Sequence, residues 1–540
     1  MNDIIKIKSK YPASQKEEIE KAIEKAGDGD AVFFEGGKYF VDGQIKIENK
    51  NNLIICGDDA TIVAHFDPKV GFWEFSGILA FKDCKNITLK QLTFDTDNPV
   101  NCAGTVVDKS AEDFTIDVML FDGCTLDSSQ TIFASCSLDE DCSPDYLFAD
   151  YTKREYKSVG ENTVRIQYSG SQKEMINNLP IGANFVIRHG LGNFTVLNRS
   201  SITFTNCDDT VMEDITVYNS AGYMVVVFPR CNNFTIRRYR VVVPQGSHRF
   251  WASNIDGIHL LGLTGECIVE DCYFDGLGDD ALNIHSTSGF VDELTDGRIK
   301  VSNHRFNIPL EENWCRKGDK ISVYGADFLR KGKITVKDYD GENIYFDHID
   351  GTLEVGDVVG NDEYLAKITV TGTTVRNTRA RALLFQTNNV TVKDCYFFGM
   401  SASAILLAPD IRVWHEVGPC ENVLIENCIF DKCAMSKNDV QHAVQGAVMV
   451  RCSHDAHGID YPAGVHKNIV IKNNKFVDIP ASCVCVCGTD GITVTDNLFL
   501  NCSGEGGLNG MKKYDVFIKN CKNITVENNE TENENILHVE

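Results

Sequence analysis

A short pattern of hydrophobic and polar residues recurs along this chain. A β-branched run leads to an acidic or amide residue, then to Asn or Cys, and in most copies then to an aromatic residue. The copies begin at Ile87, Cys267, Val390, Val423, Ile469, Ile492 and Ile524, as in ITLKQLTF, CIVEDCYF and ITVTDNLF. Ile469 and Ile492 lie 23 residues apart, and so do Val211 and Phe234 in two similar segments.

The period and the residue types together predict the fold. Short strands at this period, separated by Asn, Asp and Gly, are what a coiled solenoid requires. The period is too short for helical repeats, and the residues favour strands. We therefore predict an all-β chain, a right-handed parallel β-helix, whose N-terminal end is covered by a helix near residues 14–26. Asn-x-Thr triplets recur at one phase of the repeat, at Asn86, Asn389 and Asn523, and we interpret each Asn as a turn that enters a strand.

The pattern breaks in two places, and each break predicts an inserted domain. Residues 105–190 and 289–361 contain short strands and turns without the repeat, so we expect two small β-barrel-like insertions. The expected division of the chain is 1–104 for the N-terminal cap and first coils, 105–190 for the first insertion, 191–288 for the central coils, 289–361 for the second insertion, and 362–540 for the C-terminal coils.

Composition narrows the classes of partner and the compartment. The formal net charge of −25 disfavours nucleic acid and anionic membranes as partners. No apolar run reaches the roughly 18 residues that would span a membrane, and the polar N-terminus is unlike a signal peptide. We therefore expect a cytoplasmic protein whose 21 cysteines are thiols, or a secreted one if a leader is absent from this sequence. We expect no metal and no cofactor.

Three aspartates are the strongest candidates for chemistry. Asp279 and Asp280 are adjacent in GLGDDALNIH, and Asp256 precedes Asp279 by 23 residues, one coil of the predicted β-helix. The three carboxylates should therefore lie on one wall, where mutual repulsion raises at least one pKa. Such a group suits acid–base catalysis of glycoside hydrolysis. Gly257 and Gly278 would let a sugar approach the backbone.

Two plainer interpretations of the aspartates stay open at this point. Solenoid turns use Asp freely, as Asp208 and Asp209 illustrate. Clustered aspartates on a β-helix can also hold calcium. The register of Asp256 with the pair, and the nearby His259 and His285, favour a catalytic group.

The segment that carries these residues resembles a known family. DGIHLLGLTGECIVEDCYFDGLGDDALNIHSTSG, and later VRNTRARALLFQTNNVTVKDCYF, are similar to the central coils of glycoside hydrolase family 110. The resemblance covers roughly residues 200–500. That family has an Asp followed by Gly, an intervening coil, and then a double Asp followed by Asn-x-His. Here these positions are Asp256, Asp279, Asp280, Asn283 and His285.

The resemblance implies an exo-acting α-galactosidase that removes terminal galactose with inversion, and it favours the α-1,3 linkage. Asp280 is then our choice of general acid, with Asp256 and Asp279 holding the water. An inverting pair should lie roughly 6.5–9.5 Å apart, whereas one coil rises only about 5 Å, so the side chains must splay.

Further residues are candidates for substrate binding. The predicted binding residues are His259, Asn283, His285, Arg379, Trp414 and Glu416. Arg379 and Arg381 alternate on one expected strand, where they would contact sugar hydroxyls, hold the aspartates, or form salt bridges elsewhere. Trp414 is either a platform for a sugar ring beside Glu416 or a cap on the side of the solenoid.

Two rival functions stay open. A polygalacturonase-type hydrolase of family 28 also has an Asp followed by Gly and then a double Asp, but its Gly-His-Gly turn and Arg-x-Lys motif have no counterpart in a suitable place here. A non-catalytic β-helix that binds carbohydrate is the other rival. The expected partner is a galactose-terminated glycan, and the sequence also allows a homodimer.

Overall fold

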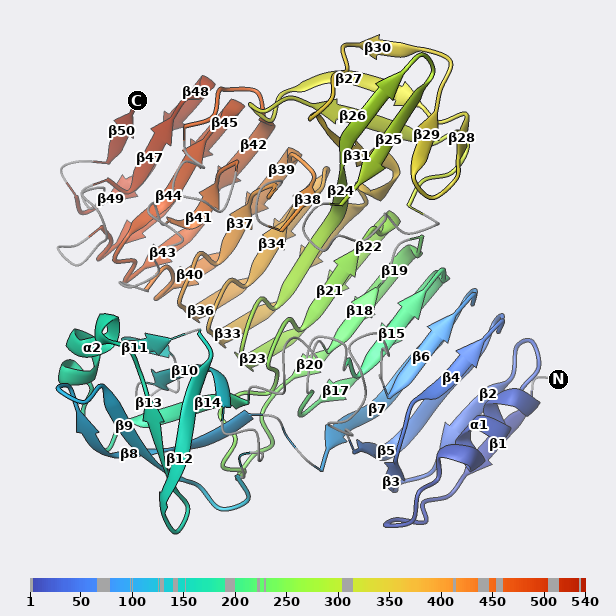
Figure 1. The fold of residues 1–540 in the computed structure, drawn as a ribbon, viewed down its shortest axis with the longest axis vertical. Helices are drawn as coiled ribbons and strands as arrows, with labels where there is room; N and C mark the ends of the chain where they lie inside the picture. Colours follow the sequence, from blue (N-terminus) through green and yellow to red (C-terminus); the bar gives the residue numbers. More distant parts are fainter. Residues whose placement is uncertain are drawn as a thin grey trace.

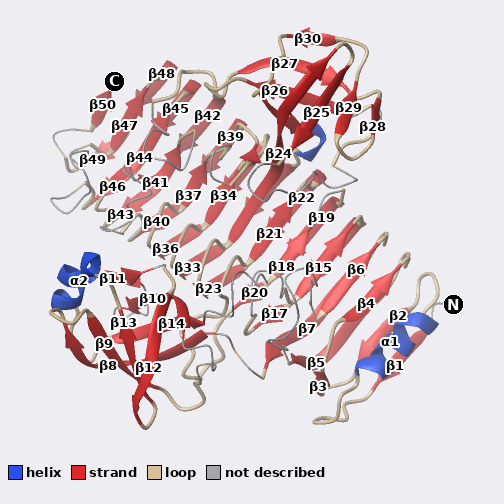
Figure 2. Ribbon diagram, viewed as in Figure 1, coloured by secondary structure: helices blue, strands red, loops and turns tan. Residues whose placement is uncertain are grey.

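The computed structural model of this chain is a β-helix with two domains that project from its middle (Figure 1). The structure describes residues 3–65, 78–97, 99, 101–124, 126, 131–138, 144–150, 152–189, 200–220, 224–227, 230–303, 314–410, 414–435, 446–452, 460–503, 514–533 and 536–540. Strands dominate throughout, and the helices are few and short (Figure 2).

Parallel strands form three ladders, and each coil of the β-helix after that of β1 adds a strand to each ladder. The first ladder contains β1 (Ile4–Ile7), β2 (Ala31–Phe34), β5 (Ile54–Ala64), β7 (Thr88–Thr96), β16 (Asp208–Glu213), β19 (Asn232–Arg237), β22 (Thr264–Glu270), β32 (Lys367–Thr371), β35 (Val390–Lys393), β39 (Glu421–Glu426), β42 (His466–Lys472), β45 (Thr489–Thr495) and β48 (Lys522–Glu527). The second contains β3 (Gly37–Val41), the ends of β5 and β7, β17 (Thr216–Val217), β20 (Arg240–Val241), β23 (Tyr273–Leu277), β33 (Thr374–Thr378), β36 (Tyr396–Met400), β40 (Ile429–Asp431), β43 (Lys475–Val477), β46 (Leu498–Leu500) and β49 (Glu530–Thr531).

The third ladder carries the candidate site. It contains β4 (Ile45–Glu48), β6 (Leu79–Lys82), β15 (Ile202–Thr205), β18 (Val225–Val227), β21 (Ile258–Leu261), the start of β24 (Leu282–Thr295), β34 (Leu383–Phe385), β37 (Ile405–Leu407), β41 (Gly446–Val450), β44 (Ser482–Cys487), β47 (Val516–Lys519) and β50 (Leu537–Val539). Because its strands are parallel, residues one coil apart lie side by side.

Stacked apolar side chains fill the inside of the β-helix. Phe430 stacks on Phe397 and Phe476 with ring centroids 5.1 and 4.6 Å apart, about the spacing of neighbouring strands. Ile469 pairs with Ile492, as the period of 23 predicts. The prediction for Val211 is wrong by one residue: it pairs with Thr235, and the buried Thr210 pairs with Phe234, because that coil has one residue more.

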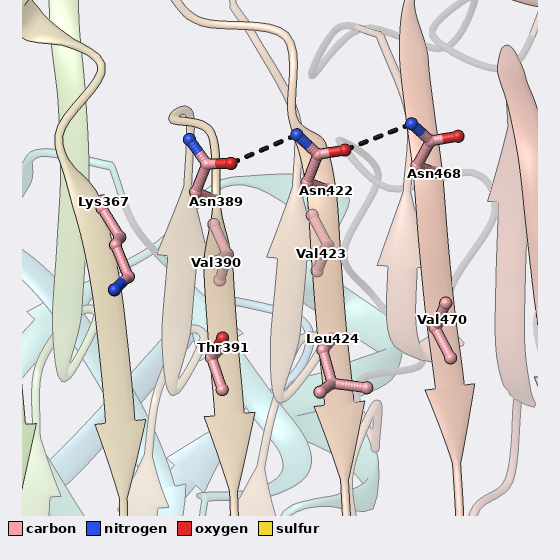
Figure 3. Close-up of a pocket in the computed structure, with 9 residues that line it drawn as sticks. All are labelled: Lys367, Asn389, Val390, Thr391, Asn422, Val423, Leu424, Asn468 and Val470. Atoms are coloured by element: carbon pink, nitrogen blue, oxygen red, sulfur yellow. Dashed lines mark hydrogen bonds between the residues drawn. The ribbon is translucent and has the colours of Figure 1, made fainter.

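Asparagines in the left-handed conformation make the turns into many strands. Asn86, with a φ of 53°, and Asn389, with a φ of 57°, precede β7 and β35, so the turn interpretation is confirmed for both. Asn523 has the same left-handed conformation, with a φ of 53°, but it is the second residue of β48. Their side chains can also stack along the β-helix. Figure 3 shows Asn422 donating to Asn389 and accepting from Asn468, each over 3.1 Å. Each amide in such a column satisfies a neighbour as both donor and acceptor.

The helix predicted near the N-terminus is confirmed. α1 (Lys16–Lys25) buries Ile19, Ala22 and Ile23 against the first coils, and these side chains are part of the main core. Its opposite face is polar, so α1 ends the apolar interior next to β1 (Figure 1).

The first insertion is an antiparallel barrel with a core of its own. Its elements are β8 (Asn101–Ser110), β9 (Thr115–Leu120), β10 (Thr131–Leu138), β11 (Pro144–Asp150), β12 (Arg154–Gly160), β13 (Thr163–Gln167), α2 (Lys173–Asn178) and β14 (Asn184–His189). Pairing runs β8–β9–β13–β12–β10–β14 and returns to β8, so the sheet closes. Ile116, Phe148 and Phe185 are among the side chains that fill it.

The second insertion continues directly from the third ladder. β24 leaves the ladder and pairs with antiparallel strands around a core that includes Trp314 and Ile344. The other strands are β25 (Arg298–Ser302), β26 (Lys320–Tyr324), β27 (Arg330–Thr335), β28 (Asp338–Tyr339), β29 (Asn343–Tyr345), β30 (Ile349–Gly351) and β31 (Val358–Asn361). The predicted fold class, a right-handed parallel β-helix with two inserted β-barrel-like domains, is confirmed. In the described residues no helix has the length and apolarity needed to cross a membrane.

Candidate active site

The three aspartates meet just before β21 and β24 begin. Ile258 pairs with Leu282, so Asp256 lies beside Asp280, and the Gly257 amide donates to the Asp280 carbonyl over 2.9 Å. One carboxylate oxygen from each of Asp256, Asp279 and Asp280 lies within 4.8 Å of the others. The expectation that they share one wall is therefore confirmed. The one-coil partner of Asp256 is Asp280 rather than Asp279, because this coil has 24 residues.

Close packing of neighbouring coils accounts for the two glycines beside the aspartates, and their role in the approach of a sugar stays a prediction. A Cβ atom at Gly257 would lie 2.7 Å from the Ala281 carbonyl oxygen, and one at Gly278 would lie 2.6 Å from that of Asn254. Both positions therefore lack a side chain because neighbouring coils pack backbone against backbone.

Two arginines hold the aspartate pair. Arg381 contacts both oxygens of Asp280, at 2.7 and 2.8 Å, and its backbone amide donates to Oδ1 over 3.0 Å. Arg379 contacts Asp279 at 2.8 Å. The placement of these arginines on one strand is wrong: they lie in the turn between β33 and β34, and their role is to hold the aspartates. They occupy oxygens that a calcium ion would need, so the cluster fits that ion poorly.

Two histidines extend the site from Asp256. His259 Nδ1 lies 2.7 Å from Asp256 Oδ2, and His259 Nε2 lies 3.0 Å from His285 Nε2. The strands explain this contact, because β21 and β24 are paired neighbours and both histidines stand on the outer side of the ladder. Burial lowers the pKa of His259 to about 4, which makes this imidazole neutral at neutral pH.

A carboxylate from a later coil reaches the same histidines. β38 (Glu416–Val417) pairs antiparallel with β24, which places Glu416 opposite Thr287. Glu416 Oε1 lies 3.7 Å from His285 Nε2, and Gln386 donates to Glu416 Oε2 over 2.7 Å. Gln386 was missed from the sequence, where it is one amide among several in FQTNN. Its signal lies in the register, since it follows β34 one coil beyond Ile284 and His285.

The three aspartates differ in burial and in their charged neighbours. Burial and then repulsion from Asp279 raise the pKa of Asp256 well above its usual range. Burial also raises the pKa of Asp280, to about 7, against the opposing effect of Arg381. Asp279 is the most accessible, with 24% of its side chain exposed. The ion-pair partner of Asp256 in the described part of the chain is a histidine rather than an arginine, and its buried carboxyl group therefore favours the protonated form.

The remaining predicted binding residues border this group. Asn283 stands beside His259 on the paired strand, and its buried Oδ1 finds no hydrogen-bond partner among the described residues. Gln386 Oε1 is in the same situation within the described chain. Trp414 precedes Glu416 by two residues and is 45% exposed, and its role as a sugar platform or as a cap on the side of the solenoid stays a prediction.

Both insertions contact the segments that carry the site. Trp251 packs with Cys136 and Leu138 of the first barrel, and Asn101 of that barrel donates to Asn254 over 3.3 Å, two residues before Asp256. In the second, Trp314 donates to Thr287, beside the pairing of β24 with β38. The site thus lies where both insertions meet the third ladder. A shallow pocket of about 410 Å³ lies elsewhere, on the first ladder, and no carboxylate is among its described lining residues (Figure 3).

Comparison with known proteins supports the resemblance seen in the sequence. Residues 351–499 match the family model described as "Right handed beta helix region". The chain is 27% identical over 329 residues to "Alpha-1,3-galactosidase B" of Akkermansia muciniphila, which is 59% of this chain and 40% of that protein. It is 23% identical over 541 residues to the protein of the same name from Bacteroides thetaiotaomicron, covering 93% of this chain and 82% of that protein. The resemblance to glycoside hydrolase family 110 is confirmed.

The chain spans less than half of the Akkermansia protein but most of the Bacteroides one. Solved structures with a similar fold include a family 28 exopolygalacturonase of Yersinia enterocolitica, at 10% identity and a TM-score of 0.47, covering 98% of this chain and 79% of that one. A family 87 alpha-1,3-glucanase domain in complex with tetrasaccharides gives 10% identity and a TM-score of 0.43, covering 99% and 68%. The relation to family 110 rests on the sequence comparisons.

Proposed function

We propose that this protein is a glycoside hydrolase that removes terminal α-linked galactose, with a preference for the α-1,3 linkage. The observation that carries the proposal is the group of three aspartates, whose oxygens converge within 4.8 Å and which two arginines and a histidine hold in different environments. The α-1,3-galactosidase names of its relatives support the sugar and the linkage.

The surroundings of the three aspartates favour catalytic roles that differ from those expected from the sequence. Asp256 holds a proton most strongly, so it is the better general acid for the leaving oxygen. Asp279 is the accessible carboxylate and would activate the water. Asp280, clamped on both oxygens by Arg381, would stabilise the positive charge that develops at the sugar ring.

Substrate hydroxyls would complete the hydrogen bonding of the site. A buried carbonyl oxygen without a partner costs roughly 1–3 kcal/mol, and Asn283 and Gln386 each present one. Two sugar hydroxyls could donate to these oxygens. Trp414 is exposed beside Glu416 and would offer a face for the sugar ring.

Inversion is part of the proposal because of the family resemblance. The nearest aspartate oxygens are closer than the roughly 6.5–9.5 Å typical of inverting carboxyl pairs. A water between Asp256 and Asp279 therefore requires the two carboxyl groups to turn their far oxygens toward it. The stereochemistry is accordingly measured first.

The test is hydrolysis of α-1,3-galactobiose followed by proton NMR. We expect β-galactose as the first product, release slowed by about 10²–10⁴-fold in Asp256→Asn, and normal release by Asp209→Asn, which changes a left-handed Asp at the start of β16 on another coil. α-Galactose as the first product would overturn inversion. Cleavage of digalacturonate instead would assign the chain to the polygalacturonase type, and cleavage of neither would favour a carbohydrate-binding β-helix.

A further inference from the structure

Asp256, His259 and His285 are linked by hydrogen bonds in series. Which group donates in each bond follows from the donors and acceptors around the two histidines. His285 Nδ1 lies 3.4 Å from the carbonyl oxygen of Ser286. A carbonyl only accepts, so the hydrogen bond requires a proton on Nδ1. In a neutral His285, Nε2 is then an acceptor.

The tautomer of His285 determines where the proton of His259 lies and, through His259, whether Asp256 donates. With His285 neutral, its Nε2 accepts, and the 3.0 Å contact with His259 then requires a proton on His259 Nε2. His259 is neutral because of its burial, so its Nδ1 carries no proton and accepts. The 2.7 Å contact with Asp256 Oδ2 then requires the carboxyl group to be the donor.

We propose that His259 and His285 are positioning residues that act in series to keep the catalytic proton on Asp256. The carbonyl of Ser286 selects the tautomer of His285, His285 selects that of His259, and His259 offers Asp256 an acceptor only. His285 therefore acts on the acid without touching it. This inference rests on the proposed function, in which Asp256 is the general acid.

The charged groups around Asp256 act on its proton in opposite directions. Asp279 and Glu416 face Asp256 with like charge and favour its protonated form, whereas Arg381 and a backbone hydrogen bond from Asp280 favour the carboxylate. A proton on His285 Nε2 would reverse the series, because His259 would then accept at Nε2 and donate to a carboxylate at Asp256. Glu416, at 3.7 Å, is held away from hydrogen-bonding distance of Nε2 while Gln386 donates to its other oxygen.

The first test is the pH dependence of kcat/KM. A general acid loses activity as the pH rises through its pKa, which gives a basic limb. His285→Phe removes the acceptor, so His259 is free to donate to Asp256, and we expect the basic limb about one pH unit lower. His285→Gln, whose amide oxygen can accept, should return the basic limb most of the way to its wild-type position. An unmoved limb in His285→Phe, with only a lower kcat, would overturn the proposal.

A matched control comes from another buried histidine. His466 accepts from the Cys420 amide and contacts the Arg451 carbonyl, and burial likewise lowers its pKa to about 4. His466→Phe should leave the basic limb in place. A limb that moves as far in His466→Phe as in His285→Phe would show that loss of any buried imidazole has this effect, and would contradict the series.

The second test needs no substrate. In protein labelled with ¹⁵N-histidine, we expect at neutral pH a proton on Nδ1 of His285 and on Nε2 of His259, with signals assigned by the single variants. A proton on Nδ1 of His259 would overturn the inference. If the wild type releases no galactose, the proposed function fails, and these tautomers still decide whether the histidines act in series.

Discussion

Asn422 and its neighbours form one column of stacked side chains along the β-helix, and Asp256 with Asp280 forms another. In the first, each amide donates to one neighbour and accepts from the next. In the second, two carboxyl groups one coil apart are both acceptors when ionised, so they repel each other. The structure compensates with Arg381 on Asp280 and His259 on Asp256. Stacked amides therefore satisfy one another as donors and acceptors, whereas stacked carboxylates need a proton or a cation.

The largest expected effect comes from turning the aspartate column into an amide column. Asp256→Asn removes the acidic proton, and we expect kcat/KM for an α-galactoside to fall by about 10²–10⁴-fold, the usual contribution of a general acid. Asn422→Asp, the reverse change in the other column, should leave kcat/KM within about twofold. Equal activity in Asp256→Asn and the wild type would remove Asp256 from the chemistry.

The next effect is on stability. Asp280→Asn leaves the buried Arg381 without its carboxylate, and we expect a loss of about 3–5 kcal/mol in the free energy of unfolding, measured by urea denaturation. The double variant Asp280→Asn with Arg381→Met should recover most of this loss. A loss below about 1 kcal/mol in the single variant would mean that solvent reaches Arg381 and the pair is not buried.

A pH series separates the two columns further. The raised pKa of Asp256 means that the folded state holds this proton more tightly than the unfolded state. Its stabilising contribution is complete below the unfolded pKa of about 3.9 and is lost as the pH rises toward the folded pKa. Asp256→Asn should therefore gain stability relative to the wild type as the pH rises from 4. A constant difference across that range would show that the pKa of Asp256 is not raised.

The smallest effect is expected in the asparagine column itself. Asn422→Asp replaces a donor to Asn389 with an acceptor, and we expect a loss of about 0.5–1.5 kcal/mol at neutral pH. Protonation of the new carboxyl group should reduce the loss near pH 3, because the group then donates again. Thermal unfolding at the two pH values measures the difference, and an equal loss at both would mean that the side-chain bond contributes little.

Much of the fold follows from the sequence because a solenoid repeats one local rule. Ile469 and Ile492 show the period, Asn86 and Asn389 show the turns, and the loss of the pattern marks both insertions. The division of the chain at 105–190 and 289–361 stays a prediction. A coil length that varies by one residue could not be anticipated from a period, and that single residue pairs Asp256 with Asp280 instead of Asp279.

The site was predictable where one segment carries it and not where distant coils meet. Asp256, Asp279 and Asp280 lie close in sequence, and their convergence needs only the coil. Glu416 was a candidate from its neighbour Trp414, but its contact with His285 depends on an antiparallel pairing of β38 with β24. The direction of the histidine series depends on donor and acceptor geometry at the Ser286 carbonyl, which no sequence pattern encodes.

The central claim is that Asp256, and not Asp280, carries the proton of the resting site. Infrared difference spectroscopy measures this directly, since a protonated carboxyl group has a C=O stretch that a carboxylate lacks. At pH 8, above the pKa of about 7 for Asp280, we predict that this band is lost in Asp256→Asn and retained in Asp280→Asn. A band that is retained in Asp256→Asn and lost in Asp280→Asn would contradict the account and assign the acid to Asp280.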